Sequence, residues 1–423
     1  MQSNCPRHEH LSRRSLLKGC VATTAGGTLM NWGGLFHSLA LADDVQKKQK
    51  HCILLWMNGG ASQFETFDMK VGRPVGGPAR PISTNVAGTQ ICEWMPTIAK
   101  HMDKLCVIRS MRTSQVDHPQ GIHLMHTAYS EAANIRFPEI GAVVARYLGR
   151  EDSALPNFIK IGSNGESGSG FLGPKYQPFG LGHDGQLPPF ARSPIKPDVE
   201  SRRNDLRMFL EDIHATRHKA ETARMHVEAY ASARRLQSAL GTFKIDEQWT
   251  KYESQYGDSF FGRNCLLARQ LVEAGVPFVE VGHSGYDTHT DNFTGHKGLL
   301  APMEFAWAGL MTDLADRGLL DQTLIVWMGE IGRTPQINNR AGRDHYVRAW
   351  STALAGCGVK GGLIHGETDR DGHDVTSGKV TEGDFFATIY EALGIAPNTE
   401  HFAGSRPVPI APFGSNVVKE LLA

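Results

Sequence analysis

The chain has 423 residues, which is enough for two or three average domains or for one large α/β unit. Its 44 Lys and Arg residues balance 44 Asp and Glu residues, so the formal net charge at pH 7 is zero. This balance argues against a nucleic-acid partner and against an acidic solvating tail.

The first forty or so residues have the pattern of an export signal. Arg13 and Arg14 stand in "HLSRRSLLKG", and a weakly apolar run leads to small residues at 40–42. The pattern resembles a bacterial twin-arginine signal, and an ordinary secretory signal that contains two arginines is the alternative. We therefore predict that residues 1–42 are a signal peptide for the twin-arginine translocase. This route implies a protein that folds before export, often around a metal, and then resides in the periplasm or outside the cell.

The cysteines beyond that segment form no closely spaced pair. Most of them lie inside apolar runs, which indicates buried free thiols. No later stretch is long and apolar enough to predict a stable membrane span. These five cysteines are Cys52, Cys92, Cys106, Cys265 and Cys357.

Short apolar runs alternate with longer helical patterns along residues 43–423, which predicts an α/β fold with a mostly parallel sheet covered by helices. The runs are punctuated by Gly, Pro or Asn, as strands of such a sheet commonly are. The predicted strands are, in chain order, 51–60, 103–111, 275–285, 324–330 and 351–358.

Two helical patterns, 262–275 and 300–318, end in a glycine that would cap the helix. A Gly/Pro-rich segment at about 162–197 predicts a lid or a binding loop. A charged segment at about 205–240 predicts one or two surface helices. We interpret both segments as insertions into a single domain, 43–423.

Polar residues follow the predicted strands at the points where the strands end. In open α/β sheets the ligand binds beyond the carboxyl ends of the strands, because loops converge there. Oxygen and imidazole groups without thiolates suit a hard or borderline divalent cation such as Zn, Mn, Ca or Mg. The alternative for each Asp and His pair is a structural or solvent-exposed pair. The predicted metal ligands are Asp287, His289, Glu330, Asp344 and His345.

Two further strand-end residues have predicted roles beside the cation. Arg333 suits a sulfate or phosphate oxyanion, because a guanidinium donates several hydrogen bonds in one plane. The alternative for Arg333 is a structural salt bridge with Glu330, three residues before it. Asn58 would orient the ligand or a water molecule.

The segment "SQVDHPQGIHLMHTAYS" supplies three histidines. If it is helical after Pro119, His123 and His126 lie on one face and His118 stands at the start of the helix. His118 and His123 are predicted to contact the substrate or to form a second metal position. The alternative, which we favour for His126, is a helix histidine without a ligand.

Several strings together resemble the bacterial domain-of-unknown-function family 1501, in the family's order and over nearly the whole mature chain. They include "LLWMNGGASQFETFDMK", "DHPQGIH", "GYDTHTDN", "GEIGRTP", "GRDHY" and "GETDRDG". The family is grouped by likeness with the alkaline phosphatase and sulfatase superfamily. The resemblance implies a metal-dependent hydrolase with a central, mostly parallel mixed sheet and metal ligands at strand ends. It also implies that Ser110 or Thr113, at a strand end in "RSMRTSQ", supplies a hydroxyl nucleophile, although an ordinary surface turn is the alternative for both.

Matched to the superfamily, this sequence also shows departures. Asn58 is an amide where the first ligand is acidic, and Ile331 stands beside Glu330 where a histidine is expected. No Cys-x-Pro-x-Arg sulfatase signature occurs. These departures weaken a two-metal site more than a one-metal site. The leading hypothesis is an exported metal-dependent hydrolase of a sulfate or phosphate ester, including one on a polysaccharide. The alternative is a secreted binding or assembly protein that keeps the fold.

Overall fold

The computed structural model describes residues 49–423 except 164–166, 190, 192–193 and 218–220. The predicted signal peptide, 1–42, lies outside the described residues. No helix in the described part of the chain is both long enough and apolar enough to cross a membrane.

The centre of the protein is an eight-stranded mixed sheet. Five of its strand pairs are parallel, and only the pairs on either side of β11 are antiparallel. The predicted α/β fold with a mostly parallel mixed sheet is therefore confirmed. In spatial order the strands are β12 (Leu363–His365), β4 (Leu105–Met111), β11 (Trp350–Ala355), β8 (Thr323–Met328), β1 (His51–Asn58), β7 (Phe278–Ser284), β5 (Phe158–Ile161) and β6 (Phe179–Leu181).

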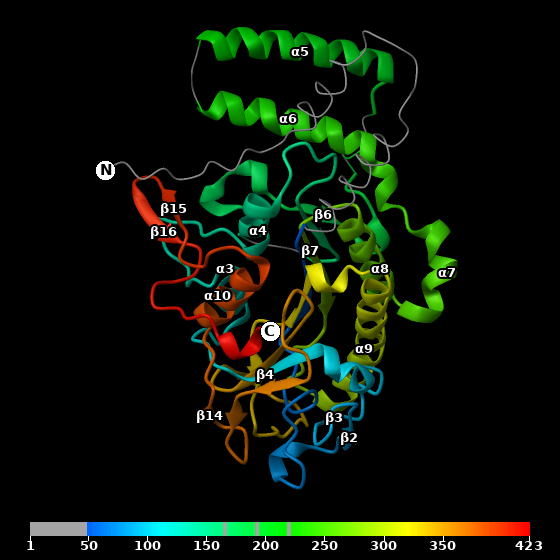
Figure 1. The fold of residues 1–423 in the computed structure, drawn as a ribbon, viewed down its shortest axis with the longest axis vertical. Coiled ribbons are helices and arrows are strands. Elements are labelled where there is room, and N and C mark those ends of the chain that lie inside the picture. The colour runs from blue at the N-terminus through cyan, green and yellow to red at the C-terminus, as the bar shows by residue number, and fades with distance from the viewer. Residues whose placement is uncertain (1–48, 164–166, 190, 192–193, 218–220) are drawn as a thin grey trace, which may run out of the picture. The chain divides into compact units, whose positions relative to one another are not determined.

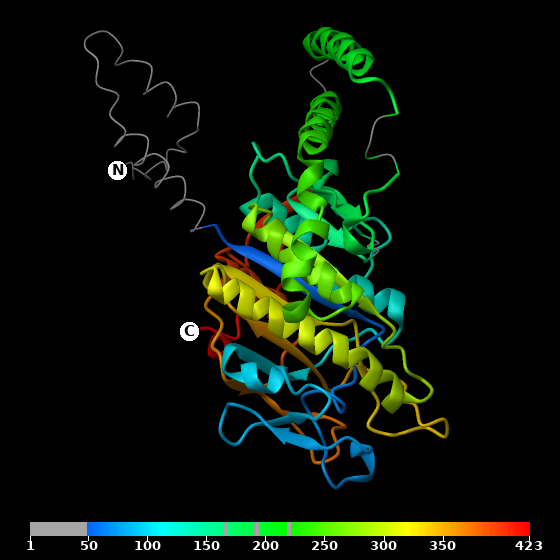
Figure 2. The ribbon, with the colours of Figure 1, turned by 90° about the vertical axis from the view of Figure 1, so that its right-hand side faces the viewer.

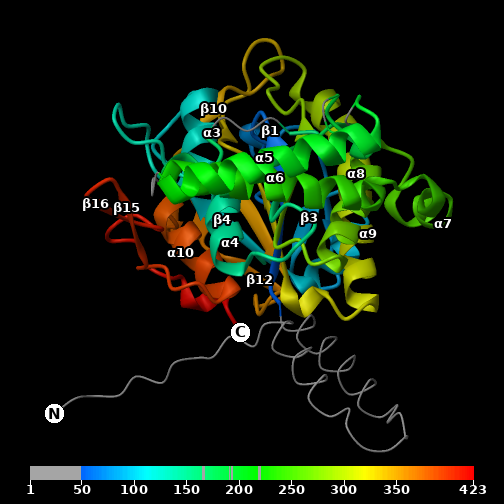
Figure 3. The ribbon, with the colours of Figure 1, turned by 90° about the horizontal axis from the view of Figure 1, so that it is seen from above.

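Each of the five predicted strand ranges overlaps one of these strands, and β8 and β11 begin one residue earlier than predicted. The strands are mostly apolar, without a regular alternation of polar residues, because both faces of the sheet are covered. In β1, Ile53 and Leu55 belong to one buried cluster, while Leu54 and Trp56 belong to the cluster on the opposite face. Figure 3 shows helices on both sides of the sheet, with α8 and α9 on one side and α3, α4 and α10 on the other. The helices are α3 (His118–Thr127), α4 (Ile140–Leu148), α5 (Pro197–Arg217), α6 (Glu221–Ala239), α7 (Asp246–Tyr256), α8 (Phe260–Glu273), α9 (Asn292–Asp316) and α10 (Glu382–Leu393).

Helix ends follow local sequence signals, although α9 and α5 each begin eight residues earlier than predicted. α8 begins after Ser259, whose hydroxyl accepts a hydrogen bond from the Gly262 amide. α9 begins at Asn292, eight residues before the predicted start, and Pro302 lies inside it. The glycine predicted to end this helix, Gly318, has a φ of 66°.

Short antiparallel strand pairs lie in the loops around the main sheet. One of them, formed by β9 and β10, brings together two segments that supply predicted metal ligands. The pairs are β2 (Pro81–Ser83) with β3 (Gln90–Cys92), β9 (Gly332–Arg333) with β10 (His345–Tyr346), β13 (Glu367–Thr368) with β14 (Val375–Ser377), and β15 (Glu400–Ala403) with β16 (Arg406–Pro409).

The two helices α5 and α6 form a hairpin that stands at one end of the molecule (Figure 1). They cover the charged segment predicted to be helical, and α5 starts eight residues earlier than predicted. The Gly/Pro-rich segment before them contains β6 and single turns of 3-10 helix such as Gly170–Leu172. Figure 2 shows the hairpin again at the end of the molecule, beyond the layers that cover the sheet.

Candidate metal centre

The loops after β1, β7 and β8 meet at the carboxyl end of these three parallel neighbours. The Tyr286 amide donates to the Asn58 carbonyl over 3.2 Å, which ties the loop after β7 to the end of β1. Gly59 has a φ of 105°, and a Cβ added there would lie 2.4 Å from the Asp287 amide nitrogen. Only glycine permits this approach of two backbones, so the sequence Asn-Gly-Gly fixes where Asp287 stands.

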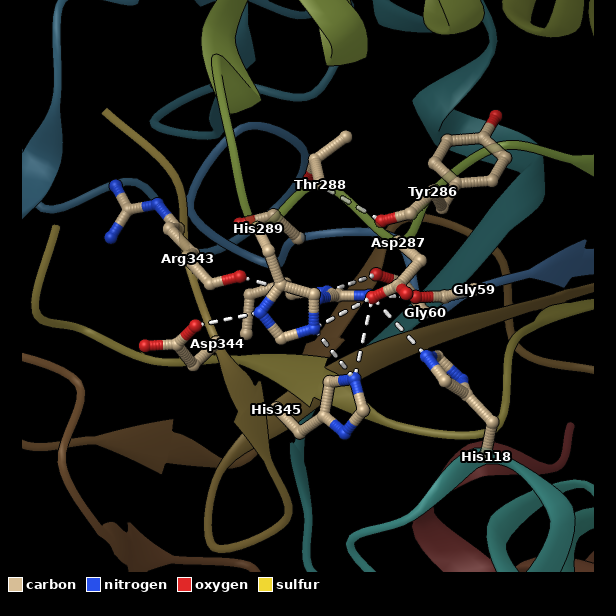
Figure 4. A network of polar contacts seen from close by, with 12 residues as sticks. Gly59, Gly60, His118, Tyr286, Asp287, Thr288, His289, Arg343, Asp344 and His345 are labelled. Atoms are coloured by element: carbon tan, nitrogen blue, oxygen red, sulfur yellow. Dashed lines mark hydrogen bonds and ion pairs between the residues drawn. The ribbon is translucent and has the colours of Figure 1, made fainter. Parts of the chain in front are cut away.

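Three imidazoles converge on one carboxylate oxygen, Oδ1 of Asp287 (Figure 4). The Nε2 atoms lie 3.2 Å away for His118, 3.0 Å for His289 and 3.3 Å for His345. The Nε2 atoms of His289 and His345 are also 3.0 Å apart. The three histidines come from the start of α3, from the loop after β7 and from β10. The structure therefore joins His118, a predicted substrate contact, to three of the predicted metal ligands.

Two other predicted ligands lie behind the imidazoles. The Glu330 carboxylate is 2.7 Å from Nδ1 of His118 and also accepts the Gly59 amide hydrogen over 2.8 Å. The Asp344 carboxylate is 2.6 Å from Nδ1 of His289. A carboxylate that accepts the Nδ1 hydrogen leaves the Nε2 lone pair free and fixes the direction of the ring. Glu330 and Asp344 thus occupy the positions of partners that orient ligands.

Arg333 lies beneath the cluster and is completely buried. Its guanidinium donates to the carbonyls of Gly59, Gly60 and Arg343, and to Asp287 Oδ1 over 2.8 Å. Its ion-pair partner is therefore Asp287 and not Glu330, which corrects the alternative considered from the sequence. Four of its five N–H donors have protein acceptors, so little capacity is left for a bound anion.

The segment that carries Asp344 and His345 is fixed by a second buried arginine. In β9 and β10, His345 lies opposite Arg333. The Arg343 guanidinium forms an ion pair of 2.8 Å with Glu65, and both side chains are fully buried. Sequence reasoning assigned no role to Glu65, although it lies inside the quoted string "GASQFETFDMK". Its neighbours Gln63, Thr66 and Asp68 are polar too, so nothing in the sequence singled it out.

The charges around the cluster favour an ionised carboxylate. Burial acts to raise the pKa of the Asp287 carboxyl, but the hydrogen bond and the charge of Arg333, followed by those of His118, hold it well below its usual range. The hydrogen bond to Glu330 raises the pKa of His118. Burial, reinforced by the charges of His118 and Arg333, lowers the pKa of His345.

This set of atoms fits a cation. The Nε2 lone pairs point at an ionised oxygen and at one another. These electron-rich atoms repel each other unless a proton or a metal ion lies between them. Separations of 3.0–3.3 Å are what two ligands about 2.0–2.1 Å from one zinc ion would show. The side chains are 24% exposed for His118, 45% for Asp287 and 34% for His289, whereas Glu330 is 0% exposed. The cluster therefore has a buried floor and a side open to small molecules.

Sequence comparison places the chain in a family. Residues 49–422 match the family described as "Protein of unknown function (DUF1501)". The chain belongs to this family. No curated protein sequence matches it.

Among solved structures, this DUF1501 protein is similar to the PsFucS1 sulfatase from Pseudoalteromonas sp., at 12% identity and a TM-score of 0.42, over 92% of this chain and 75% of that chain. It is also similar to the phosphonate monoester hydrolase SpPMH from Silicibacter pomeroyi, at 10% identity and a TM-score of 0.39, over 88% and 76% of the two chains. A protein in the alkaline phosphatase superfamily from Vibrio parahaemolyticus aligns at 10% identity and a TM-score of 0.38, over 82% and 67%. At these scores the similarity carries no inference about activity.

Four predicted site residues of this DUF1501 protein make contacts of other kinds. The Ser110 hydroxyl lies in β4 and donates to the Gly378 carbonyl, and the Thr113 amide donates to Val347. The His123 Nδ1 lies 2.8 Å from the Ser167 hydroxyl, in the Gly/Pro-rich segment. Asn58 contributes its backbone carbonyl, as described above. The hydrogen bonds of Ser110 and Thr113 lie away from the three convergent imidazoles, because β11 and β8 separate β4 from β1 in the sheet.

His126, eight residues after His118 on α3, belongs to a different group, which we call the buried ionic group. It comprises His126, Glu139, Lys160 and Glu280, all at most 4% exposed. The Lys160 ammonium lies 2.6 Å from Glu139 and 3.3 Å from Glu280, and His126 Nε2 lies 3.4 Å from Glu280. Burial acts to lower the pKa of His126, but the charge and hydrogen bond of Glu280 outweigh it and raise the pKa. The ammonium already supplies the cation between the two carboxylates, so this group is structural.

Proposed function

We propose that this protein is an exported metal-dependent hydrolase that acts on a sulfate or phosphate ester, including one carried on a polysaccharide. The observation that supports it most is the convergence of three Nε2 atoms on Asp287 Oδ1. A site with three imidazoles and one carboxylate binds a divalent cation such as Zn or Mn. When bound there, the cation would polarise the ester and lower the pKa of coordinated water.

Each neighbouring residue then has a proposed task. His118, His289, His345 and Asp287 hold the cation. Glu330 and Asp344 hold two of these imidazoles in the tautomer that presents Nε2, which replaces their predicted role as direct ligands. Arg333 positions Asp287, which replaces its predicted contact with the oxyanion, because its donors face protein acceptors.

The nucleophile in this proposal is water. Of the two hydroxyls expected from the family resemblance, that of Ser110 donates to the Gly378 carbonyl, while that of Thr113 is buried and has no hydrogen-bond partner among the described residues. The same observation favours the second candidate function, a secreted binding or assembly protein in which the cation is structural. The N-terminal signal supports export through the twin-arginine translocase for both candidates.

The experiment compares the protein with its His289→Ala and His101→Ala variants. The control residue His101 hydrogen-bonds to Thr97 and Thr312 and lies outside the cluster. Metal content is measured after purification, and hydrolysis of aryl sulfate and aryl phosphate is measured with and without a chelator. We expect bound metal and chelator-sensitive hydrolysis in the protein and in His101→Ala, and neither in His289→Ala.

The outcomes separate the candidates. Bound metal that depends on His289, without turnover of either ester, supports the binding protein. Equal metal content in both variants contradicts the assignment of His289 as a ligand. Hydrolysis that survives the chelator contradicts the metal-dependent mechanism.

A further inference from the structure

A second concave site lies near the candidate metal centre, at the same edge of the main sheet. It is a pocket of about 360 Å³ between the end of β7, the start of α8 and the loops after β5 and β6. Pockets that bind small molecules commonly measure roughly 300–1,000 Å³, so this one suits a ligand of one or two rings. The ten residues that line it include no Asp, Glu, Lys or Arg.

The loop after β7 connects this pocket to the metal cluster. Ser284 lines the pocket at the end of β7 and Asp287 follows three residues later, so their Cα atoms are at most about 11 Å apart. In Figure 4 the Tyr286 ring points away from the three imidazoles. Its hydroxyl lies 2.9 Å from Nδ1 of His283, which also lines the pocket. A ligand that extends from the cluster across this loop would therefore enter the pocket.

His283 presents one N–H donor to the pocket. The Tyr286 side chain is fully buried and His283 is the hydrogen-bond partner of its hydroxyl, so we assign the hydroxyl as the donor to Nδ1 and the imidazole proton to Nε2. Burial, followed by the charge of His183, lowers the pKa of His283 to about 4, so the ring is neutral at pH 7. Nε2 forms no hydrogen bond with another residue in the described part of the chain, so its N–H is available to a ligand.

Asn264 supplies a second donor in a fixed position. Its side chain is completely buried, its carbonyl accepts the Asp184 amide hydrogen over 3.0 Å, and its amide donates to Nδ1 of His183 over 3.2 Å. A side-chain amide has two N–H groups, so one remains after the bond to His183. Ser284 is exposed at the edge of the pocket and adds a hydroxyl, which can both donate and accept.

Two phenylalanines of α8 add apolar surface to the pocket. Phe260 is 63% exposed and its ring centre lies 5.5 Å from that of His183, while Phe261 is buried and its ring centre lies 4.7 Å from that of His283. These pairs of rings are inclined at 38° and 50°, so neither forms a parallel-sided slot for a planar base. An exposed phenyl ring beside hydrogen-bond donors suits a ligand with C–H groups on one face and hydroxyls at its edge, which is the surface of a sugar ring.

The absence of charge in the lining narrows the class of ligand further. A carboxylated or phosphorylated ring would lose water in this pocket without meeting a counter-ion, which is costly. A purely apolar ligand would leave the N–H groups of His283 and Asn264 without acceptors. A neutral sugar ring satisfies both conditions, because it is uncharged and its hydroxyls accept hydrogen bonds.

We propose that this pocket binds a neutral sugar unit of the glycan that carries the ester. Phe260 packs on the C–H face of the sugar, and His283 and Asn264 donate to its hydroxyls. The proposal rests on the proposed hydrolase function, since it places the ester itself at the metal cluster. It narrows the substrate to a glycan in which an uncharged sugar lies close to the esterified one.

The test measures the binding of neutral sugars by calorimetry and by saturation-transfer NMR. The probes are disaccharides and hexasaccharides of glucose, galactose, mannose, xylose and fucose, with adenosine as an uncharged planar probe. The protein is compared with Phe260→Ala and His283→Ala, and the matched control is Phe402→Ala, which removes a phenyl ring that is 65% exposed elsewhere. Metal content and circular dichroism are measured for every variant.

We expect at least one neutral sugar to bind the protein and Phe402→Ala, with a Kd weakened by at least ~10-fold in Phe260→Ala and in His283→Ala. Both pocket variants should keep the metal. His289→Ala should lose the metal and still bind the sugar, so failure of the metal site and failure of the pocket are distinguishable. Binding of none of the sugars, equal binding by Phe260→Ala and Phe402→Ala, or binding of adenosine alone overturns the proposal.

Discussion

The Glu330→Gln substitution tests whether the carboxylates behind the imidazoles control metal affinity. Glu330 is fully buried and accepts two hydrogen bonds, from the Gly59 amide at 2.8 Å and from His118 Nδ1 at 2.7 Å. Glutamine keeps the size of the side chain but removes the charge. If its amide N–H faces Nδ1 of His118, the imidazole proton must move to Nε2, which is the atom proposed to bind the cation.

The expected magnitude follows from these contacts. A hydrogen bond to a charged group contributes about 1.5–3 kcal/mol, and replacement of such a partner of a metal-bound histidine weakens metal affinity by roughly 10–100-fold. We expect a loss of this size in the association constant for Zn²⁺, measured by competition with a chromogenic chelator. The backbone contact with Gly59 can persist through the amide oxygen, so the fold should be retained.

The matched control is Glu304→Gln. Glu304 is 4% exposed and accepts the Thr97 and Ile98 amide hydrogens at 2.8 and 2.9 Å, so it is also a buried carboxylate with backbone donors. It should lower the melting temperature and leave Zn²⁺ affinity unchanged. Unchanged affinity in Glu330→Gln, or an equal loss in both variants, would refute the role assigned to Glu330.

Three further predictions concern stability and the backbone at the site. Lys160→Met removes the ammonium between the two carboxylates of the buried ionic group, so it should lower the free energy of unfolding, measured by urea titration, by about 3–5 kcal/mol. The control Arg150→Met breaks an exposed ion pair with Asp152 and should change this free energy little. An equal change in both would be inconsistent with this view. The raised pKa of His126 means that its contribution to stability is complete below pH 6.5 and disappears as the pH rises through the folded value. The fall in unfolding free energy on the alkaline side should therefore be smaller in His126→Phe, and identical profiles would contradict this. Gly59→Ala should abolish metal binding, measured by calorimetry, because the added Cβ would collide with the loop that carries Asp287. The control Gly88→Ala has nothing within 4 Å of the added Cβ, so it should keep the metal and lower the free energy of unfolding by only about 1–2 kcal/mol.

The sheet could be predicted from the sequence because its signals are local. The run at β1 is apolar on both faces, and glycines or polar residues punctuate its ends, so its residues determine a buried strand without knowledge of its neighbours. The start of α9 was predicted eight residues too late because its first two turns, "NFTGHKG", contain two glycines and few apolar residues. Glycine and polar residues give little local helix signal, and these turns are held by packing that is not visible in the sequence.

The candidate site could be predicted only as a set of residues. Asp287, His289 and His345 were expected at strand ends, and the structure brings them together. The sequence could not show which residues are proposed ligands and which orient them, because that depends on which atom of each side chain faces the cluster. His118 was expected to contact the substrate or to form a second metal position, and only the docking of α3 against Glu330 places it in the cluster.

X-ray absorption at the zinc edge of the Zn²⁺-loaded protein tests the central claim most directly. The Nε2 atoms of three imidazoles lie within 3.3 Å of Asp287 Oδ1, and the ligand atoms of His118, Asp287 and His345 all lie within 4.8 Å of one another. We predict a first shell of nitrogen and oxygen at about 2.0–2.1 Å, with the outer-shell scattering of three imidazoles, reduced to two in His118→Ala. A shell of oxygen atoms alone, or a spectrum unchanged by His118→Ala, would contradict the account.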